Sequence, residues 1–177
     1  MRGVRYIVRT LVILGLLVTL AAVAPRVSPA ASPHTVRITL VAGKTQDNGG
    51  FNFDGYAKGG MTVTVPVGWK VEVEFENAAP LPHSLAVTPF RTTQAAEGIT
   101  APAFPGGATR DLLAGLPRGE RAAVTFVASR PGRYELACGV PGHAVIGMWV
   151  SLIVSATAKR ATVLPAIAAK TAGLSAQ

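Results

Sequence analysis

One short stretch of the sequence gathers three side chains that bind soft metal ions. The chain's single cysteine opens the segment Cys138-Gly-Val-Pro-Gly-His143-Ala-Val-Ile-Gly-Met148, with the spacing Cys-x4-His-x4-Met, and another histidine, His83, lies earlier in the chain. Sulfur ligands favour Cu(I) and imidazole suits Cu(I) and Cu(II), so two His, one Cys and one Met are typical of a copper centre that transfers single electrons. We therefore predict a copper site formed by His83, Cys138, His143 and Met148.

Each of these residues also has an ordinary structural role to weigh against ligation. A lone cysteine is most often a small buried apolar residue, a methionine in a strand is usually core, and a single histidine is more often structural than a ligand. Taken together, the spacing of Cys138, His143 and Met148 favours metal binding over these structural roles. Met61 lies on an alternating apolar strand face and is predicted to be core, whereas His34 lies before the first strand and is predicted to be solvated.

The residue counts exclude several other classes of metal protein. One cysteine is too few for a disulfide framework, a zinc ribbon or a cysteine-ligated iron–sulfur cluster. Three histidines are too few for a multicopper oxidase, and a copper nitrite reductase needs a second copper for which only His34 is left. The counts favour an electron carrier over an enzyme. The alternatives are a copper-binding or trafficking module, although the sequence lacks the usual Met- and His-rich tracts, and a β-sandwich without metal.

The segment that carries the ligands must be held between strands. Apolar and polar residues alternate with period two along most of residues 36–154, which predicts half-buried strands. The only sizeable irregular stretch is residues 92–116, and we expect a short helix or a long loop there. The predicted strands cover residues 36–42, 61–65, 71–76, 85–87, 124–128, 134–138 and 148–154. They predict an all-β fold, a Greek-key sandwich or barrel, in which Cys138 ends one strand and Met148 begins the next.

The two ends of the chain differ in composition from its middle. Residues 1–31 contain Arg2, Arg5 and Arg9, then an apolar run from Leu11 to Ala24, an order typical of a signal peptide or an N-terminal membrane anchor. The run is shorter than the about 20 residues of a membrane span, so both interpretations stay open. Either one predicts an extracytoplasmic domain, in the periplasm or on the outer face of the membrane. Residues 32–155 are predicted to form the copper-binding domain, and residues 156–177 a flexible tail containing Ala and Lys.

The net charge of +8 comes mostly from these ends. Seven of the 17 basic residues lie in residues 1–31 or 156–177, which leaves ten basic and nine acidic residues for 32–155. A nucleic-acid-binding protein needs a basic face on its folded domain. We therefore predict no nucleic-acid partner, and a monomer with one copper per chain.

The ligand motifs resemble those of the cupredoxins, and most closely those of the sulfocyanins, the membrane-associated blue copper proteins of archaeal respiratory chains. The loop 138–149 and the segment 81–85 (LPHSL) are similar to cupredoxins in general, whereas the segments 51–56 (FNFDGY) and 61–71 (MTVTVPVGWKV) point to sulfocyanin. Rusticyanin-like proteins share the loop spacing. The resemblance implies an eight-stranded or slightly elaborated sandwich, one type 1 copper on the four named ligands, and a one-electron carrier whose redox partner is a cytochrome or a terminal oxidase complex.

Two features beside the ligands carry further predictions. We expect the hydroxyl or backbone of Ser84 to tie the loop of His83 to that of Cys138, as outer hydrogen bonds usually do around metals; the alternative is a strand serine that faces solvent. Apolar residues flank both ligand segments, among them Leu81, Val145 and Ile146. They predict an uncharged rim at which a redox partner docks near His143.

Overall fold

The computed structural model describes residues 34–92 and 96–165. The signal peptide or anchor predicted for residues 1–31 lies outside the described residues. Within the described ranges, no helix has the length and apolar character needed to cross a membrane.

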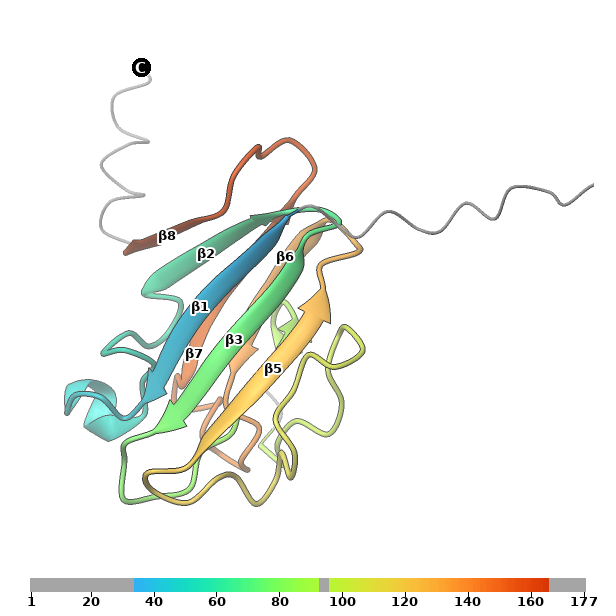
Figure 1. Cartoon of the computed structure of the whole chain (residues 1–177). Coiled ribbons are helices and arrows are strands. Elements are labelled where there is room, and N and C mark those ends of the chain that lie inside the picture. The colour runs from blue at the N-terminus through green and yellow to red at the C-terminus, as the bar shows by residue number, and fades with distance from the viewer. Residues whose placement is uncertain (1–33, 93–95, 166–177) are drawn as a thin grey trace, which may run out of the picture. The chain divides into compact units, whose positions relative to one another are not determined.

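In the described part of the chain, eight strands form two packed sheets (Figure 1). The three-stranded sheet has the order β1-β3-β5 and the five-stranded sheet the order β4-β6-β7-β2-β8. In chain order the strands are β1 (Thr35–Ala42), β2 (Met61–Pro66), β3 (Lys70–Asn77), β4 (Ala86–Pro89), β5 (Arg121–Val127), β6 (Gly132–Ala137), β7 (Trp149–Ser155) and β8 (Thr162–Pro165). The predicted Greek-key sandwich is confirmed.

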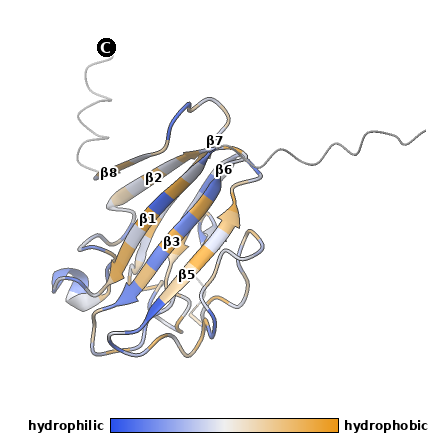
Figure 2. Cartoon of the chain, in the orientation of Figure 1, coloured by the Kyte–Doolittle hydropathy of each residue, from blue (hydrophilic) through white to orange (hydrophobic). Residues whose placement is uncertain are grey.

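The sequence alternation decides which side of each strand is buried. Along β3 the residues Val71, Val73 and Phe75 are almost fully buried, while Glu74 between them is exposed. Figure 2 shows the same alternation of apolar and polar residues along β1 and β3. Because successive side chains of a strand point to opposite faces, the apolar set of each sheet meets that of the other sheet in one core. Met61 belongs to that core, as predicted.

The register of the strands defines two poles of the sandwich. β1 and β3 are parallel, so both end at the same pole, at Ala42 and Asn77. β6 ends at that pole and β7 begins there, since Ala137 pairs with Trp149. We call this the ligand pole. The opposite, distal pole holds the starts of β1 and β3 and the ends of β5 and β7.

The structure adds detail to two segments, the predicted C-terminal tail and the predicted irregular stretch. The flexible tail predicted for residues 156–177 contains an ordered strand, because β8 pairs antiparallel with β2, Thr162 lying opposite Thr64. Backbone hydrogen bonds along an open sheet edge hold it there, and its side chains from Val163 to Pro165 are exposed. Residues 96–116 of the irregular segment form a loop with turns. The rest of the tail, from residue 166, lies outside the described residues.

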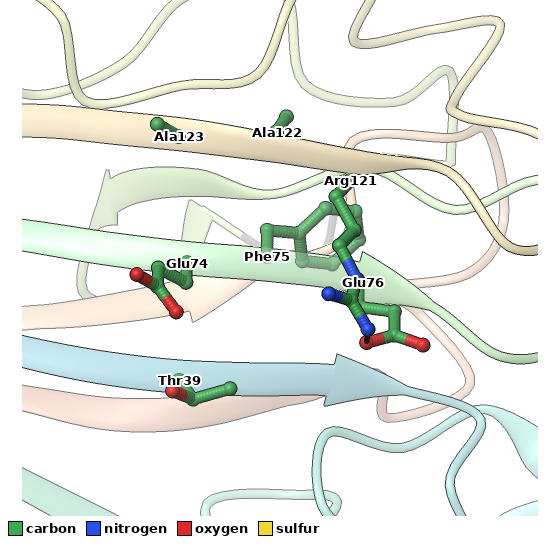
Figure 3. Close-up of a pocket in the computed structure, with 7 residues that line it drawn as sticks. All are labelled: Thr39, Glu74, Phe75, Glu76, Arg121, Ala122 and Ala123. Atoms are coloured by element: carbon green, nitrogen blue, oxygen red, sulfur yellow. Dashed lines mark ion pairs between the residues drawn. The ribbon is translucent and has the colours of Figure 1, made fainter.

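The outer face of the three-stranded sheet is polar and carries a hollow between its strands. Figure 3 shows Glu74 at the hollow and the ion pair between Glu76 and Arg121, 2.8 Å apart. None of the four predicted ligands lines this hollow.

Candidate metal centre

The loop between β6 and β7 carries three of the four predicted ligands. Cys138 follows the last residue of β6, Met148 precedes the first residue of β7, and both side chains are fully buried. The Cys138 N–H donates to the Met148 carbonyl over 3.0 Å, and the Met148 N–H donates to the His143 carbonyl over 3.0 Å. Gly142 has a φ of 81°, in the left-handed region that glycine adopts without steric cost. The loop thus turns back on itself and brings His143 to Cys138.

Three donor atoms from two separate segments meet at this loop. His83 Nδ1 lies 3.2 Å from His143 Nδ1, and Cys138 Sγ lies 3.8 Å from His83 Nδ1 and 3.5 Å from His143 Nδ1. Metal bonds of about 2 Å to nitrogen and 2.3 Å to sulfur place the donors of one ion roughly 3–4 Å apart. The three separations therefore fit a single metal ion, and thiolate with two imidazoles is the set that suits copper.

Met148 is joined to Cys138 and to His143 by backbone hydrogen bonds, and its side chain is fully buried. His34 stacks on Trp69, with ring centroids 4.6 Å apart, at the distal pole. The exposed side chain of His34 agrees with the solvated position predicted for it.

Hydrogen bonds from two directions fix the segment of His83. Its backbone pairs with Leu116, the His83 N–H donating over 3.2 Å and the Leu116 N–H donating back over 2.7 Å. Gly115, which precedes Leu116, lies so close to the backbone of His83 that an added Cβ would be 2.9 Å from the His83 nitrogen. Its φ is +73°. Any larger residue at position 115 would push against the ligand-bearing backbone.

Asn77, at the end of β3, holds the same segment through hydrogen bonds of its side chain. Its side-chain NH₂ donates to the carbonyls of Leu81 and Leu116, both over 2.8 Å, and its side-chain oxygen accepts from the Ala79 N–H over 3.0 Å. The residue is fully buried. Asn77 was not predicted at the site, because a single asparagine at a strand end does not distinguish a buried residue that holds a neighbouring loop from a solvated cap.

Ser84 joins the two ligand segments as predicted. Its N–H donates to Cys138 Sγ over 3.4 Å. Its hydroxyl donates to the Leu112 carbonyl over 2.7 Å and accepts from the Gly139 N–H over 2.9 Å. The residue is fully buried, so the alternative of a solvent-facing strand serine is wrong.

Replacement of Ser84 by Ala is expected to loosen the loop of Cys138. The change leaves the Gly139 N–H and the Leu112 carbonyl without their partner, and each unsatisfied buried group costs about 1–3 kcal/mol. We expect the free energy of unfolding to fall by about 2 kcal/mol and the reduction potential of the copper-loaded protein to shift. Chemical unfolding and voltammetry measure the two effects. A variant with unchanged stability and potential would show that the Ser84 hydroxyl plays no part at the site.

Burial sets the protonation of the ligands before a metal arrives. Burial, and after it the charge of the neighbouring His143, lowers the pKa of His83 from 6.5 to about 4. Burial also lowers the pKa of His143. Burial raises the pKa of the Cys138 thiol, against the opposing effect of the N–H groups of Ser84 and Val140. Both imidazoles are therefore neutral and ready to bind at neutral pH, whereas the thiol has to release its proton as a metal binds.

Apolar side chains surround the two histidines at the surface. Phe51 packs edge-on against both rings, with centroids 4.8 Å from His143 and 5.9 Å from His83. Leu81, Val145 and Ile146 are about half exposed, at 52, 50 and 45 %. The predicted apolar rim is thus present beside the half-buried His143, and the exposed side chain of Lys58 lies next to it at Gly147. Phe51 was not predicted at the site, since its position depends on the fold of the segment 43–56.

Comparison with known proteins agrees with this arrangement. The family model of the sulfocyanin (SoxE) domain matches residues 23–163. Sulfocyanin of Sulfolobus acidocaldarius is 30% identical over 131 residues, which are 71% of this chain. The chain covers 66% of the length of that curated relative.

Solved structures of rusticyanin and auracyanin share the fold at low sequence identity. Rusticyanin from Thiobacillus ferrooxidans superposes with a TM-score of 0.52 at 23% identity, over 70% of this chain and 79% of that one. Auracyanin from the photosynthetic bacterium Roseiflexus castenholzii superposes with a TM-score of 0.50 at 23% identity, over 69% of this chain and 98% of that one. These likenesses support the fold, and the family match supports the cofactor. The chain therefore belongs to the sulfocyanin (SoxE) domain family, is a cupredoxin, and has copper as its cofactor.

Proposed function

We propose that this protein is an electron carrier in which His83, Cys138, His143 and Met148 hold one type 1 copper. Copper bound there would supply a one-electron change between Cu(II) and Cu(I). The observation that carries the proposal is the convergence of one sulfur and two imidazole nitrogens, all within 4.8 Å of one another, in a buried site.

The protein's own residues prepare the site for rapid electron transfer. Cys138 and Met148 are fully buried, and His83 is 1 % exposed, so water is largely excluded from the donor atoms. Ser84, Asn77 and Leu116 hold the His83 segment through main-chain and side-chain hydrogen bonds. A site fixed in this way keeps nearly the same ligand positions in both oxidation states, which lowers the structural cost of each electron transfer.

Electrons would enter and leave through the edge of His143. This ring is the more exposed of the two imidazoles and lies within the apolar rim of Leu81, Val145 and Ile146. Apolar exposed patches of this kind mark docking surfaces. A redox protein such as a cytochrome or a terminal oxidase complex is the proposed partner, in brief contact with the rim.

A charge placed on the rim is expected to slow electron self-exchange between two copies of the protein. Ile146→Glu and Ile146→Lys should each slow it by about tenfold or more at low salt, because two like charges meet in the encounter. NMR line broadening in mixtures of oxidised and reduced protein measures the rate. Val163→Glu is the matched control, since Val163 is 49 % exposed on β8.

The blue absorption of these variants should stay as in the parent protein. Self-exchange as fast in both Ile146 variants as in the Val163 control would place the docking surface elsewhere.

The first 31 residues support a place outside the cytoplasm. Arg2, Arg5 and Arg9 precede the apolar run from Leu11 to Ala24, and a basic flank stays on the cytoplasmic side. We propose that this segment exports the domain or holds it at the membrane, where it serves a respiratory chain. Fractionation of cells that make the full chain tests this: the copper domain should be digested by protease added outside the cell membrane, and complete protection would contradict export.

A further inference from the structure

Exposed basic side chains gather at the distal pole, away from the metal centre. Arg91, Arg130 and Arg133 and, in the loop between β7 and β8, Lys159 and Arg160 are all exposed. Arg91 follows the distal end of β4, Arg130 that of β5, and Lys159 with Arg160 that of β7. Arg133 lies at the start of β6. The copper domain is nearly neutral in sum, but its charge is unevenly placed.

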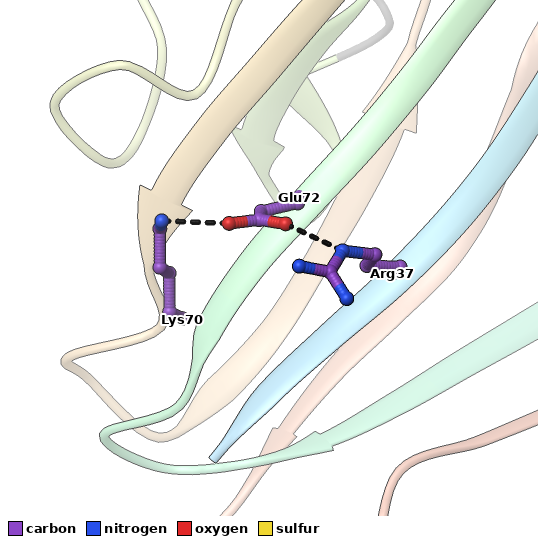
Figure 4. Close-up of polar contacts among 3 residues, drawn as sticks. All are labelled: Arg37, Lys70 and Glu72. Carbon is purple, nitrogen blue, oxygen red and sulfur yellow. Dashed lines mark hydrogen bonds and ion pairs between the residues drawn. The ribbon is translucent and has the colours of Figure 1, made fainter. Parts of the chain in front are cut away.

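Few carboxylates lie against these five side chains in the described part of the chain: the buried Glu135 accepts the backbone N–H of Arg91 over 3.0 Å, without an ion pair to its guanidinium group. Glu72, near the start of β3, is bound on both sides, by Lys70 at 2.6 Å and by Arg37 at 2.9 Å (Figure 4). These contacts hold the pKa of Glu72 below its usual value, the hydrogen bond from Lys70 first. Among the described residues, none of the five basic side chains is in an ion pair with a carboxylate.

Aromatic rings hold three of the guanidinium groups in place. Arg133 lies 4.0 Å and Arg91 5.5 Å from the ring centre of Phe90. Arg130 lies 5.6 Å from the ring centre of Phe104 and donates to the Ala103 carbonyl. Such stacking fixes the positive charges at the surface without cancelling them, so the pole presents a lasting positive potential.

An aromatic and two apolar side chains project from the same pole. Trp69 is half-buried and stacks on His34. Val67, in the same turn, is 37 % exposed, and Val127, at the end of β5, is 49 % exposed. Tryptophan beside basic residues is typical of protein surfaces at the boundary between lipid and water.

The chain enters the folded domain at this pole. β1 begins at Thr35, opposite Lys70, and the apolar run ends at Ala24. The ten residues between them reach at most about 35 Å when fully extended. An anchor formed by the apolar run would therefore keep the distal pole close to the bilayer.

We propose that the distal pole rests on an anionic lipid surface and so turns the metal centre away from the membrane. The inference rests on the proposed membrane anchor, to which it adds a fixed orientation. Basic side chains near an anionic leaflet are attracted to it, while Trp69 and Val67 meet its headgroup region. An anionic lipid is favoured over other anionic partners because the N-terminal apolar segment leads directly into the strand that begins at this pole.

Tryptophan fluorescence in the full chain tests the orientation. The chain has two tryptophans, so Trp149→Phe leaves Trp69 as the reporter of the distal pole, and Trp69→Phe leaves Trp149 as the reporter of the ligand pole. Each protein is reconstituted into vesicles of brominated phosphatidylcholine with or without phosphatidylglycerol. We expect bromine to quench Trp69 about twofold or more in the anionic vesicles, and to leave Trp149 unquenched.

Charge reversal provides the matched pair of variants. Lys159→Glu with Arg160→Glu should abolish most of the quenching of Trp69. Arg110→Glu with Arg118→Glu, two exposed residues of the loops away from the distal pole, should leave it unchanged.

The outcomes separate this inference from the anchor on which it rests. A chain that stays with the vesicles while Trp69 is unquenched keeps the anchor and overturns the docked orientation. Quenching that survives reversal of Lys159 and Arg160 also overturns it, and leaves the basic pole to another anion such as nucleic acid. A chain that binds only anionic vesicles, with Trp69 quenched and binding lost in high salt, supports the docked pole while the anchor fails.

Discussion

Replacement of Cys138 by Ala is expected to abolish the intense visible absorption of the copper-loaded protein. The chain has one cysteine, and its sulfur is the only thiol within reach of the two imidazoles. We expect the affinity for copper to fall more than about 100-fold, since changes outside the ligand set already cost 10–100-fold. Visible spectroscopy and a copper titration of purified protein measure both effects.

The Cys138 variant should still fold. Alanine removes one buried sulfur and keeps the backbone hydrogen bond from position 138 to the Met148 carbonyl. Met61→Leu is the matched control, because Met61 is buried in the core and is not one of the four predicted ligands; the absorption of this variant should equal that of the parent. A blue band that persists in folded Cys138→Ala protein would contradict ligation by this residue.

Replacement of Asn77 by Ala is expected to be the most destabilising change outside the ligands. Three hydrogen bonds disappear: the N–H of Ala79 loses its partner in the interior, the carbonyl of Leu81 loses the Asn77 amide, and the carbonyl of Leu116 keeps only the bond from the His83 N–H. Unsatisfied buried groups cost about 1–3 kcal/mol each, so we expect the free energy of unfolding to fall by about 2–4 kcal/mol. Denaturant unfolding of the metal-free protein measures the change.

The same variant should bind copper more weakly, because Asn77 positions the segment of His83. A loss of about 10–100-fold is expected from a residue that supports a ligand without touching the metal. Glu74→Ala on the same strand is the control, since Glu74 is exposed and surface changes stay within about 0.5 kcal/mol. If Asn77→Ala were as stable as Glu74→Ala, the positioning role assigned to Asn77 would be wrong.

The strands and the candidate ligands could be predicted from the sequence because both depend on local patterns. Period-two alternation marks a half-buried strand wherever it occurs, and β3 with its Val71, Val73 and Phe75 is the clearest example. Cys138, His143 and Met148 lie on one short loop, so their spacing alone places them together. His83 could be added because thiolate and imidazole ligands of copper are recognisable by residue type.

Features that depend on contacts between distant segments could not be predicted. Asn77 meets Leu116 across 39 residues, and Phe51 meets His143 only because the segment after β1 folds back over the loop. β8 has few buried side chains and is held by backbone pairing with β2, which leaves little trace in the sequence. The sequence shows the net charge of residues 32–155 but not where the charges lie. The basic side chains of the distal pole come together only when four strand ends meet there.

Titration of the metal-free protein with Cu(II), followed by its visible spectrum, tests the central claim most directly. We predict an intense blue thiolate-to-copper band that grows linearly, stops at one equivalent of copper per chain, and is bleached by a reductant. A pale spectrum without thiolate character, or no band at all, would show that Cys138 does not bind copper and would contradict the electron-carrier function.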